Sequence, residues 1–172
     1  MRLIIAAAAS VALLAACETA PTEPPRATAQ LKPTKGNKTF GEATFEQLNG
    51  KVRVTIFVQG LKPGQEHGLH IHEAGDCSSG DGMSAKGHFN PQGKPHAHPG
   101  TSERHAGDLP SLKANKAGRA KVVADVDIIT VAPGPTSIVG RGLIVHADPD
   151  DHKTQPTGNA GARLACGVIE LG

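Results

Sequence analysis

The segment KVRVTIFVQ, residues 51–59, decides the fold class of this chain. Valine or isoleucine occupies positions 52, 54, 56 and 58, and mostly polar side chains stand between them. Because successive side chains of a β-strand point to opposite faces, one face of this strand can be buried while the other meets water. The segment RAKVVADVDII, residues 119–129, repeats the pattern. Both segments are therefore predicted to be strands of an antiparallel sheet.

Weaker alternation marks five more candidate strands. They are residues 27–33, 39–47, 67–73, 137–146 and 162–171. Turn sequences such as LNGK, LKPG, NKAG and APGP separate the candidates, and no stretch sustains a helical period. We therefore expect an all-β fold, an antiparallel Greek-key β-sandwich or flattened barrel of about eight strands.

The N-terminal residues 1–16 are predicted to be a signal peptide. Arg2 is followed by the apolar run LIIAAAASVALLAA, which is too short for a comfortable membrane span and has the size of a signal-peptide core. The ending LAAC resembles the bacterial lipobox, in which the cysteine, here Cys17, is lipidated and becomes the first mature residue. An ordinary secretory signal cleaved nearby is the alternative. Either interpretation predicts export.

The next residues, 17–25, are predicted to be a lipid-anchored tether, because the sequence ETAPTEPP has too little apolar surface to fold. Residues 26–172 then form one domain. The lipobox predicts the periplasmic side of a bacterial cell envelope, attached to a membrane. Glu18 after Cys17 is compatible with the outer membrane.

Cys77 and Cys166 remain once Cys17 carries lipid. In an oxidising compartment such a pair is most simply a disulfide, and two free buried thiols are the alternative. The bond would close a loop of about ninety residues, which the chain-entropy model values at about 4–5 kcal/mol.

The composition excludes one class of partner. The formal net charge is +2, tryptophan and tyrosine are absent, and only four phenylalanines occur. The core must be aliphatic, and no basic stripe or aromatic platform suits nucleic acid.

Histidines collect where the strand pattern fails. Two long connections, residues 74–118 and 147–161, contain five of the nine histidines. Loops of this length are functional or indicate a wrong assignment, and their histidines favour a function. In the strand GLHIHE, His70 and His72 would share one face while Ile71 faces the core. Imidazole suits copper and zinc, and a carboxylate beside it suits zinc especially, so we predict a metal site.

Five segments together resemble a known family. GLHIHE, GHFNP, ERHAGDL, GRGLIVH and GNAGARLACGVI resemble, in order, the signature segments of copper/zinc superoxide dismutase, and the resemblance covers residues 26–172. It implies one copper and one zinc per subunit, with the superoxide anion as substrate and dioxygen and hydrogen peroxide as products. A homodimer is an assembly that the family allows, but the sequence assigns no interface to it.

The resemblance also implies a ligand set. Copper would be bound by His70, His72, His88 and His146, and zinc by His88, His96, His105 and Asp108. His88 would bridge both metals and hold a catalytic proton. In KPHAHPG, His98 is the alternative to His96 as the zinc ligand. Asp150 resembles the acid that ties a copper-side histidine to a zinc-side one.

Arg163 resembles the arginine that guides the anionic substrate. Three histidines have no role in this ligand set, and we expect them to be surface or loop residues without chemistry: His67, His98 and His152. An exported copper or zinc carrier on the same sandwich, without turnover, is the alternative function.

Overall fold

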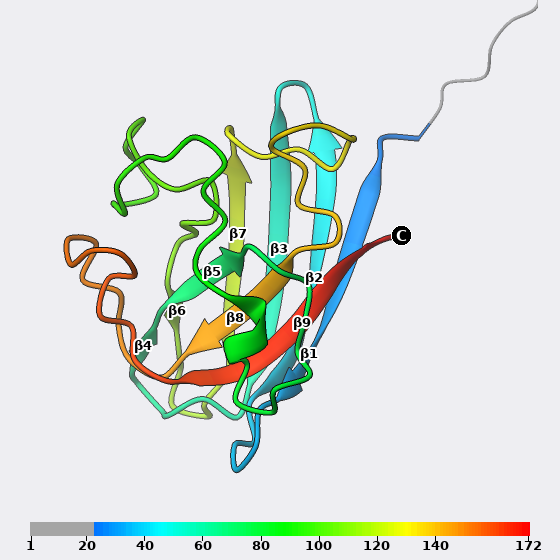
Figure 1. Ribbon diagram of the computed structural model, residues 1–172. Helices are drawn as coiled ribbons and strands as arrows, with labels where there is room; N and C mark the ends of the chain where they lie inside the picture. Colours follow the sequence, from blue (N-terminus) through cyan, green and yellow to red (C-terminus); the bar gives the residue numbers. More distant parts are fainter. Residues whose placement is uncertain (1–22) are drawn as a thin grey trace, which may run out of the picture.

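A computed structural model describes residues 23–172, shown in Figure 1. The predicted signal peptide, Cys17 and most of the predicted tether lie outside the described residues. In the part of the chain that the structure describes, no helix has both the length and the apolar character needed to cross a membrane.

Short strands account for nearly all regular structure between residues 23 and 172. The strands are β1 (Arg26–Pro33), β2 (Phe40–Leu48), β3 (Lys51–Gln59), β4 (Glu66–His67), β5 (Leu69–His72), β6 (Leu112–Lys113), β7 (Ala120–Val126), β8 (Gly142–His146) and β9 (Arg163–Leu171). One 3₁₀ turn, η1 (Met83–Ala85), interrupts the first long loop. The expected all-β fold is confirmed.

Seven strands form one curled antiparallel sheet in the order β5-β8-β9-β1-β2-β3-β7. In Figure 1, β1, β2, β3 and β7 form one layer, and β9, β8 and β5 cross in front of it. The chain leaves β3 for β5 at one edge of the sheet and returns as β7 at the other edge. Such crossings are the long connections of a Greek-key arrangement.

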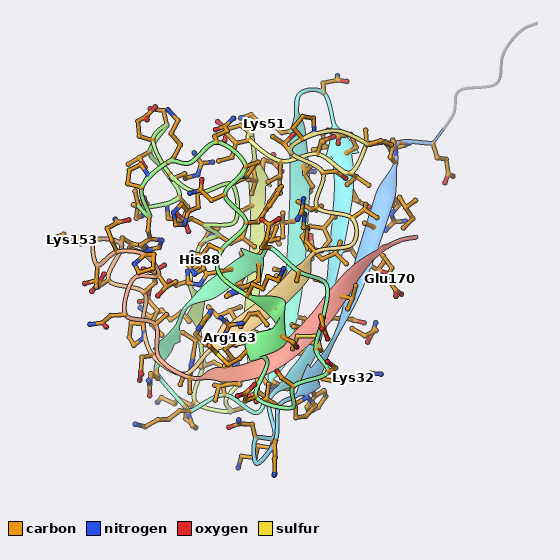
Figure 2. The ribbon with its side chains drawn as sticks, in the orientation of Figure 1. Lys32, Lys51, His88, Lys153, Arg163 and Glu170 are labelled. Carbon is orange, nitrogen blue, oxygen red and sulfur yellow. A yellow bond between two sulfur atoms is a disulfide. The ribbon has the colours of Figure 1, made fainter. Side chains whose placement is uncertain are left out.

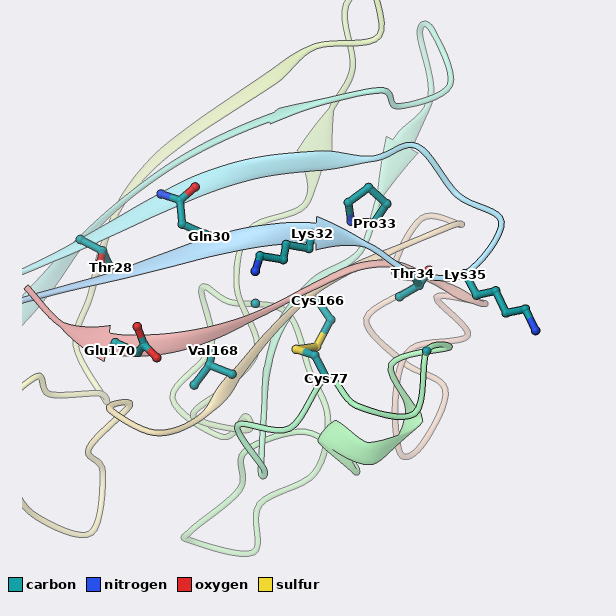
Figure 3. Close-up of a pocket in the computed structure, with 12 residues that line it drawn as sticks. Thr28, Gln30, Lys32, Pro33, Thr34, Lys35, Cys77, Cys166, Val168 and Glu170 are labelled. Atoms are coloured by element: carbon teal, nitrogen blue, oxygen red, sulfur yellow. A yellow bond between two sulfur atoms is a disulfide. The ribbon is translucent and has the colours of Figure 1, made fainter.

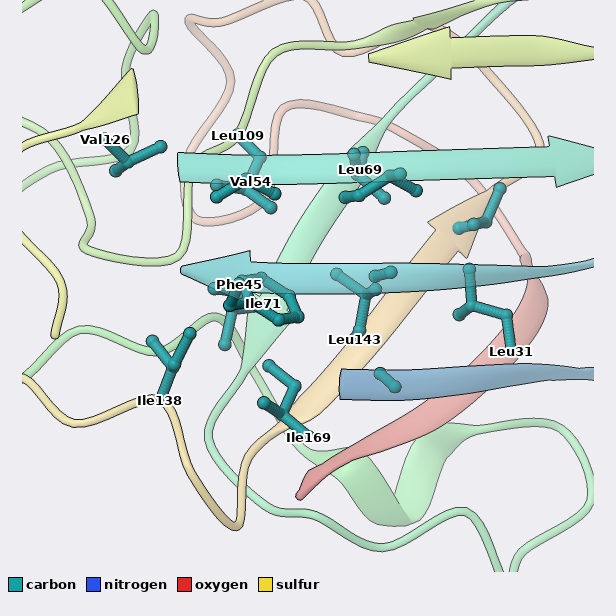
Figure 4. Packing of buried hydrophobic residues seen from close by; sticks show 14 of the residues in the cluster. Leu31, Phe45, Val54, Leu69, Ile71, Leu109, Val126, Ile138, Leu143 and Ile169 are labelled. Carbon is teal, nitrogen blue, oxygen red and sulfur yellow. The ribbon is translucent and has the colours of Figure 1, made fainter. Parts of the chain in front are cut away.

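The core lies between the two layers and is largely aliphatic, as the composition predicts. All four inward positions of β3, from Val52 to Val58, are at most 1% exposed. Phe45 of β2, Leu143 of β8 and Ile169 of β9 pack into the same cluster, which Figure 4 shows between the crossing strands. The alternation read from the sequence is therefore the alternation between core and solvent.

Two strand predictions needed correction. The candidate strand 67–73 is divided between β4 and β5, because β4 pairs with β6 in a separate two-stranded sheet, and β6 was not predicted. The candidate strand 137–146 is regular only from Gly142 to His146. Pairs this short carry no readable alternation, so the sequence pattern could not reveal them.

The disulfide between Cys77 and Cys166 is present and joins the first long loop to β9. Figure 3 shows the bond beside a pocket lined by residues of β1 and β9. The bond fixes the start of the 74–118 loop against the sheet, on the way to the histidines that follow.

Candidate metal centre

Strand β5 supplies the first two histidines. All four of its residues are fully buried, and Leu69 and Ile71 belong to the hydrophobic core. His70 and His72 therefore point to the opposite face, as the alternation requires. A strand buried on both faces needs a cover over its second face, and the long loops provide it.

The first long loop pairs with β5 as if it were another strand. The Ile71 amide donates to the Gly107 carbonyl (2.9 Å), and the Ile71 carbonyl accepts from the Phe89 amide (2.8 Å). Isolated bridges place His70 opposite Asp108 and His72 opposite His88. A side chain at Gly107 would collide with the Ile71 carbonyl, so only glycine allows this close approach. Backbone pairing thus delivers two further metal-ligand candidates to the histidines of β5.

The first cluster consists of His70, His72, His88 and His146, whose candidate ligand nitrogens lie within 4.8 Å of one another. The ring of His72 donates from Nδ1 to the Lys86 carbonyl (2.8 Å), and its Nε2 lies 3.3 Å from Nε2 of His146. The Nδ1 of His146 faces the Gly161 carbonyl at 3.3 Å. The rings of His72 and His146 are thus each held at Nδ1 by a carbonyl oxygen, which leaves Nε2 free to bind a cation.

Two nitrogens of this cluster, His70 Nδ1 and His88 Nε2, are buried and have no hydrogen-bond partner. Buried polar atoms are normally satisfied, and leaving one unpaired costs about 1–3 kcal/mol. A cation bound between the rings would satisfy both atoms.

The second cluster consists of His88, His96, His105 and Asp108. Their candidate ligand atoms also lie within 4.8 Å of one another. Asp108 Oδ1 lies 3.0 Å from His88 Nδ1, 2.9 Å from His96 Nδ1 and 3.5 Å from His105 Nδ1. The Nδ1 atoms of His88 and His105 are 3.3 Å apart. A tetrahedral zinc ion with bonds of about 2.0–2.1 Å separates its ligand atoms by about 3.3–3.4 Å. The spacing and the donor set of three imidazoles and one carboxylate fit zinc.

Asp150 connects the two clusters. Its Oδ2 accepts from His70 Nε2 (2.7 Å), and its Oδ1 accepts from His96 Nε2 (2.9 Å). The Asp150 side chain is almost completely buried. A side chain at Gly158 would collide with the Asp150 carboxylate, so glycine is needed there as well. One carboxylate therefore orients a ring in each cluster.

The electrostatics of the two clusters differ. Burial lowers the pKa of His72 and His146 well below its ordinary value, and it lowers the pKa of His88 to about 4. Burial also tends to lower the pKa of His96, but the hydrogen bonds to Asp108 and Asp150 outweigh this effect. The pKa of His96 is therefore raised to about 9. At neutral pH the first cluster is neutral and ready for a metal, whereas the second holds a proton on His96.

Arg163 is anchored beside the first cluster. Its guanidinium donates to the carbonyls of Gly82 and Lys86, each at 2.6 Å. Figure 2 shows Arg163 and His88 on the side of the sheet from which the two long loops extend. The Lys86 carbonyl also accepts from His72. The arginine and one histidine of the first cluster thus share a backbone acceptor.

The expectation for His67 was wrong. His67 is 1% exposed, and its Nδ1 donates to the carbonyl of His146 (2.9 Å). It holds the backbone that carries a histidine of the first cluster. The HxxHxH spacing was visible in the sequence, but β4 pairs only with β6, which was not predicted. His98 is exposed and lies outside the second cluster, which contains His96.

Gln155 was not singled out from the sequence either. Its Oε1 accepts from the His96 amide and its Nε2 donates to the His96 carbonyl, each at 2.8 Å. This reciprocal pair clamps the first long loop to the second. No spacing or residue pattern in the sequence indicates such a contact.

Comparison with known proteins gave consistent matches. The family model described as copper/zinc superoxide dismutase (SODC) matches residues 39–169. The chain is 38% identical over 148 residues to Cu-Zn superoxide dismutase 2 of Aquifex aeolicus (strain VF5), covering 84% of this chain and 86% of that protein. It is 47% identical over 133 residues to Cu-Zn superoxide dismutase 2 of Brassica juncea, covering 73% and 85%. A crystal structure of the clock protein EA4 matches with a TM-score of 0.78 at 39% identity, covering 90% and 99%.

We expect His88→Ala to weaken both copper and zinc binding, because one ring faces both clusters. His146→Ala should weaken copper alone, and His105→Ala zinc alone. Losing only a hydrogen-bond partner behind a ligand costs about 10–100-fold in affinity, so losing the ligand should cost at least about tenfold. Equilibrium dialysis with elemental analysis measures both metals. Loss of only one metal in His88→Ala would contradict the shared arrangement.

We expect zinc binding to the metal-free protein to release about one proton at neutral pH, since zinc needs a neutral His96. The raised pKa of His96 stabilises the metal-free fold fully below its ordinary value of 6.5, and this contribution is lost as the pH rises through about 9. Apparent zinc affinity should therefore rise about tenfold per pH unit and level off above about pH 9.

Calorimetry in buffers of different ionisation enthalpy counts the protons. Copper binding is the internal control, because the pKa values of His70, His72, His88 and His146 are all lowered by burial. Copper added alone to the metal-free protein should release almost no protons at neutral pH. Equal proton release for both metals would refute the assignment of the proton to His96.

Proposed function

Because the chain belongs to the copper/zinc superoxide dismutase family, we propose that it removes superoxide on the periplasmic side of a bacterial membrane, held there by a lipid on Cys17. Its activity is the dismutation of superoxide to dioxygen and hydrogen peroxide, with copper and zinc as cofactors. One observation carries the assignment of roles to residues. His88 presents one ring nitrogen to each of the two clusters.

Each of the two clusters is assigned to one metal. His70, His72, His88 and His146 would hold copper, and His88, His96, His105 and Asp108 would hold zinc. When bound, copper supplies one-electron redox chemistry, and zinc, which has none, supplies fixed positive charge. The carboxylate in the second cluster favours zinc there, and the all-imidazole cluster suits copper.

His88 is the residue that would hold the proton needed by the product. Its Nδ1 is committed to the Asp108 side, 3.0 Å from Oδ1. Its Nε2 is buried without a hydrogen-bond partner. A proton held at Nε2 would have no protein acceptor competing for it, so it is placed to pass to a reduced, basic oxygen species.

Arg163 would attract and position the anionic substrate. Partial burial lowers the pKa of its guanidinium below the ordinary value, which still leaves it charged at any physiological pH. Two carbonyl acceptors hold the guanidinium in place, so the positive charge is fixed rather than free to move. A fixed positive charge beside a binding site raises the encounter rate of a small anion.

A metal carrier is the weaker interpretation of the same clusters. A carrier needs neither a histidine shared between two metals nor an anchored arginine beside them. Both features are present here, and the named relatives are dismutases.

The proposed location rests on the sequence. The lipobox-like LAAC ends at Cys17, and the Pro-rich residues 18–25 could serve as a tether to the folded domain. The disulfide between Cys77 and Cys166 is typical of an oxidising compartment such as the periplasm. An enzyme there would protect the cell envelope from superoxide.

We expect Arg163→Gln to lower turnover about tenfold at low salt and to flatten its dependence on ionic strength, because a guiding charge is lost. Arg163→Lys keeps the charge and should retain the salt dependence, which makes it the matched control. Turnover is measured over a range of ionic strength, with metal content checked in each variant. An unchanged salt profile in Arg163→Gln would remove the guiding role.

We expect Cys17→Ser to move the protein from the membrane fraction to the soluble periplasmic fraction without changing activity per metallated molecule. The residue lies far along the chain from every candidate ligand, so only attachment should change. Fractionation and intact mass measure the outcome. A wild-type protein without a lipid mass on Cys17 would exclude the anchor but not the dismutase activity.

A further inference from the structure

The side chain of Arg141, directly before β8, contacts two segments that carry metal-ligand candidates. Its guanidinium carbon lies 4.2 Å from the centre of the Phe89 ring, within the range of cation–π attraction. Its Nη1 donates to the backbone carbonyl of Glu73 (2.7 Å) and to Oε1 of the same residue (2.6 Å). Glu73 follows His72 along the chain, and Phe89 follows His88. One side chain therefore holds the neighbours of two histidines of the first cluster.

The backbone around His88 is paired on both flanks with the end of β5. On one flank, the Glu73 amide donates to the Gly87 carbonyl (2.9 Å). On the other flank, the Phe89 amide donates to the Ile71 carbonyl (2.8 Å). His88 lies between these two hydrogen bonds, so the position of its ring depends on how rigidly the two segments stay paired.

Arg141 supports this pairing from the side opposite to the metal clusters. Phe89 is 1% exposed and belongs to the hydrophobic core, whereas His88 belongs to both clusters. Successive side chains of a paired segment point in opposite directions, so a contact on Phe89 does not obstruct the His88 ring. The Arg141 contacts therefore restrain the paired segments without occupying the space of a metal.

The backbone of Arg141 is itself fixed to the sheet. Its carbonyl accepts from the Ile169 amide of β9 (2.9 Å), and its amide donates to the Ile138 carbonyl (3.1 Å). The next residue, Gly142, lies so close to the Ala74 carbonyl that a Cβ would be only 2.7 Å from the oxygen. The sheet thus determines the position of residue 141, and the arginine side chain transmits that position to the loop.

We propose that Arg141 is a positioning residue for His88, which keeps the shared imidazole where one ring can face both metals. The inference rests on the proposed role of His88 as the shared ligand. Arg141 acts on one flank through Glu73 and on the other through Phe89. Without Arg141 the clusters keep all of their ligands, but the His88 ring is free to shift relative to the other histidines of the first cluster.

The test measures magnetic coupling through the His88 ring. Cu²⁺ binds nitrogen and oxygen donor sites at least as tightly as Zn²⁺, so two equivalents of Cu²⁺ can fill both clusters of the metal-free protein. Two Cu²⁺ ions that share one deprotonated imidazole are antiferromagnetically coupled and lose their EPR signal at low temperature. We expect this loss in the wild-type protein and a clear return of the signal in Arg141→Gln. Arg141→Lys, which keeps a charged donor beside Glu73 and Phe89, should restore the coupling.

The matched control is Arg53→Gln. Arg53 of β3 also binds a carboxylate, that of Asp125 (2.8 Å), but its partner lies on the neighbouring strand β7 rather than on a metal-binding loop. This variant should stay fully coupled. Thermal unfolding of the metal-free proteins is measured alongside, because a purely structural role of Arg141 would lower stability and leave the coupling complete. That result in Arg141→Gln would overturn the inference. A wild-type protein without coupling would instead refute the sharing of His88, and the inference with it.

Discussion

The whole centre depends on how the edge of the sheet at β5 is completed. β5 is the terminal strand of the seven-stranded sheet, and an edge strand leaves backbone groups that must be paired or covered. The loop segments at His88–Phe89 and Gly107–Asp108 supply the missing partners through hydrogen bonds to Ile71 and bridges to its neighbours. Because side chains alternate along β5, this pairing places loop ligands directly opposite strand ligands. The backbone requirement and the metal site are met by the same contacts.

The metal-free centre stores an unfavourable free energy that metals would release. Four imidazoles of low pKa and one charged carboxylate are buried together, and His70 Nδ1 and His88 Nε2 lack partners. Burying polar groups without partners opposes folding, so the surrounding fold must overcome this cost. The aliphatic core and the Cys77–Cys166 bond provide that stability. Metal binding then adds directly to the stability of the native state, since the unfolded chain has no such site.

Sequence reasoning succeeded where the signal was local. The alternation of Val52 through Val58 predicted β3, and the same period placed His70 and His72 on one face of β5. It failed where the determinant was a contact between distant segments. His67 was misjudged because its burial depends on the two-residue pairing of β4 with β6, and Gln155 was missed because its clamp on His96 joins two irregular loops. The ligand set itself came from resemblance to a family, since period and spacing alone indicate only a metal site.

The arginine and the copper-side cluster are mechanically linked through one backbone carbonyl. Lys86 accepts from both His72 and Arg163, and its positive φ of 64° is a conformation that few residues other than glycine adopt. The Cys77–Cys166 disulfide ties the same loop to β9, the strand on which Arg163 lies. A shift of this short segment would move the cation and the imidazole together. Attraction of the anion and geometry of the redox site are therefore set by one rigid element, which explains why a loop without regular structure is fastened at so many points.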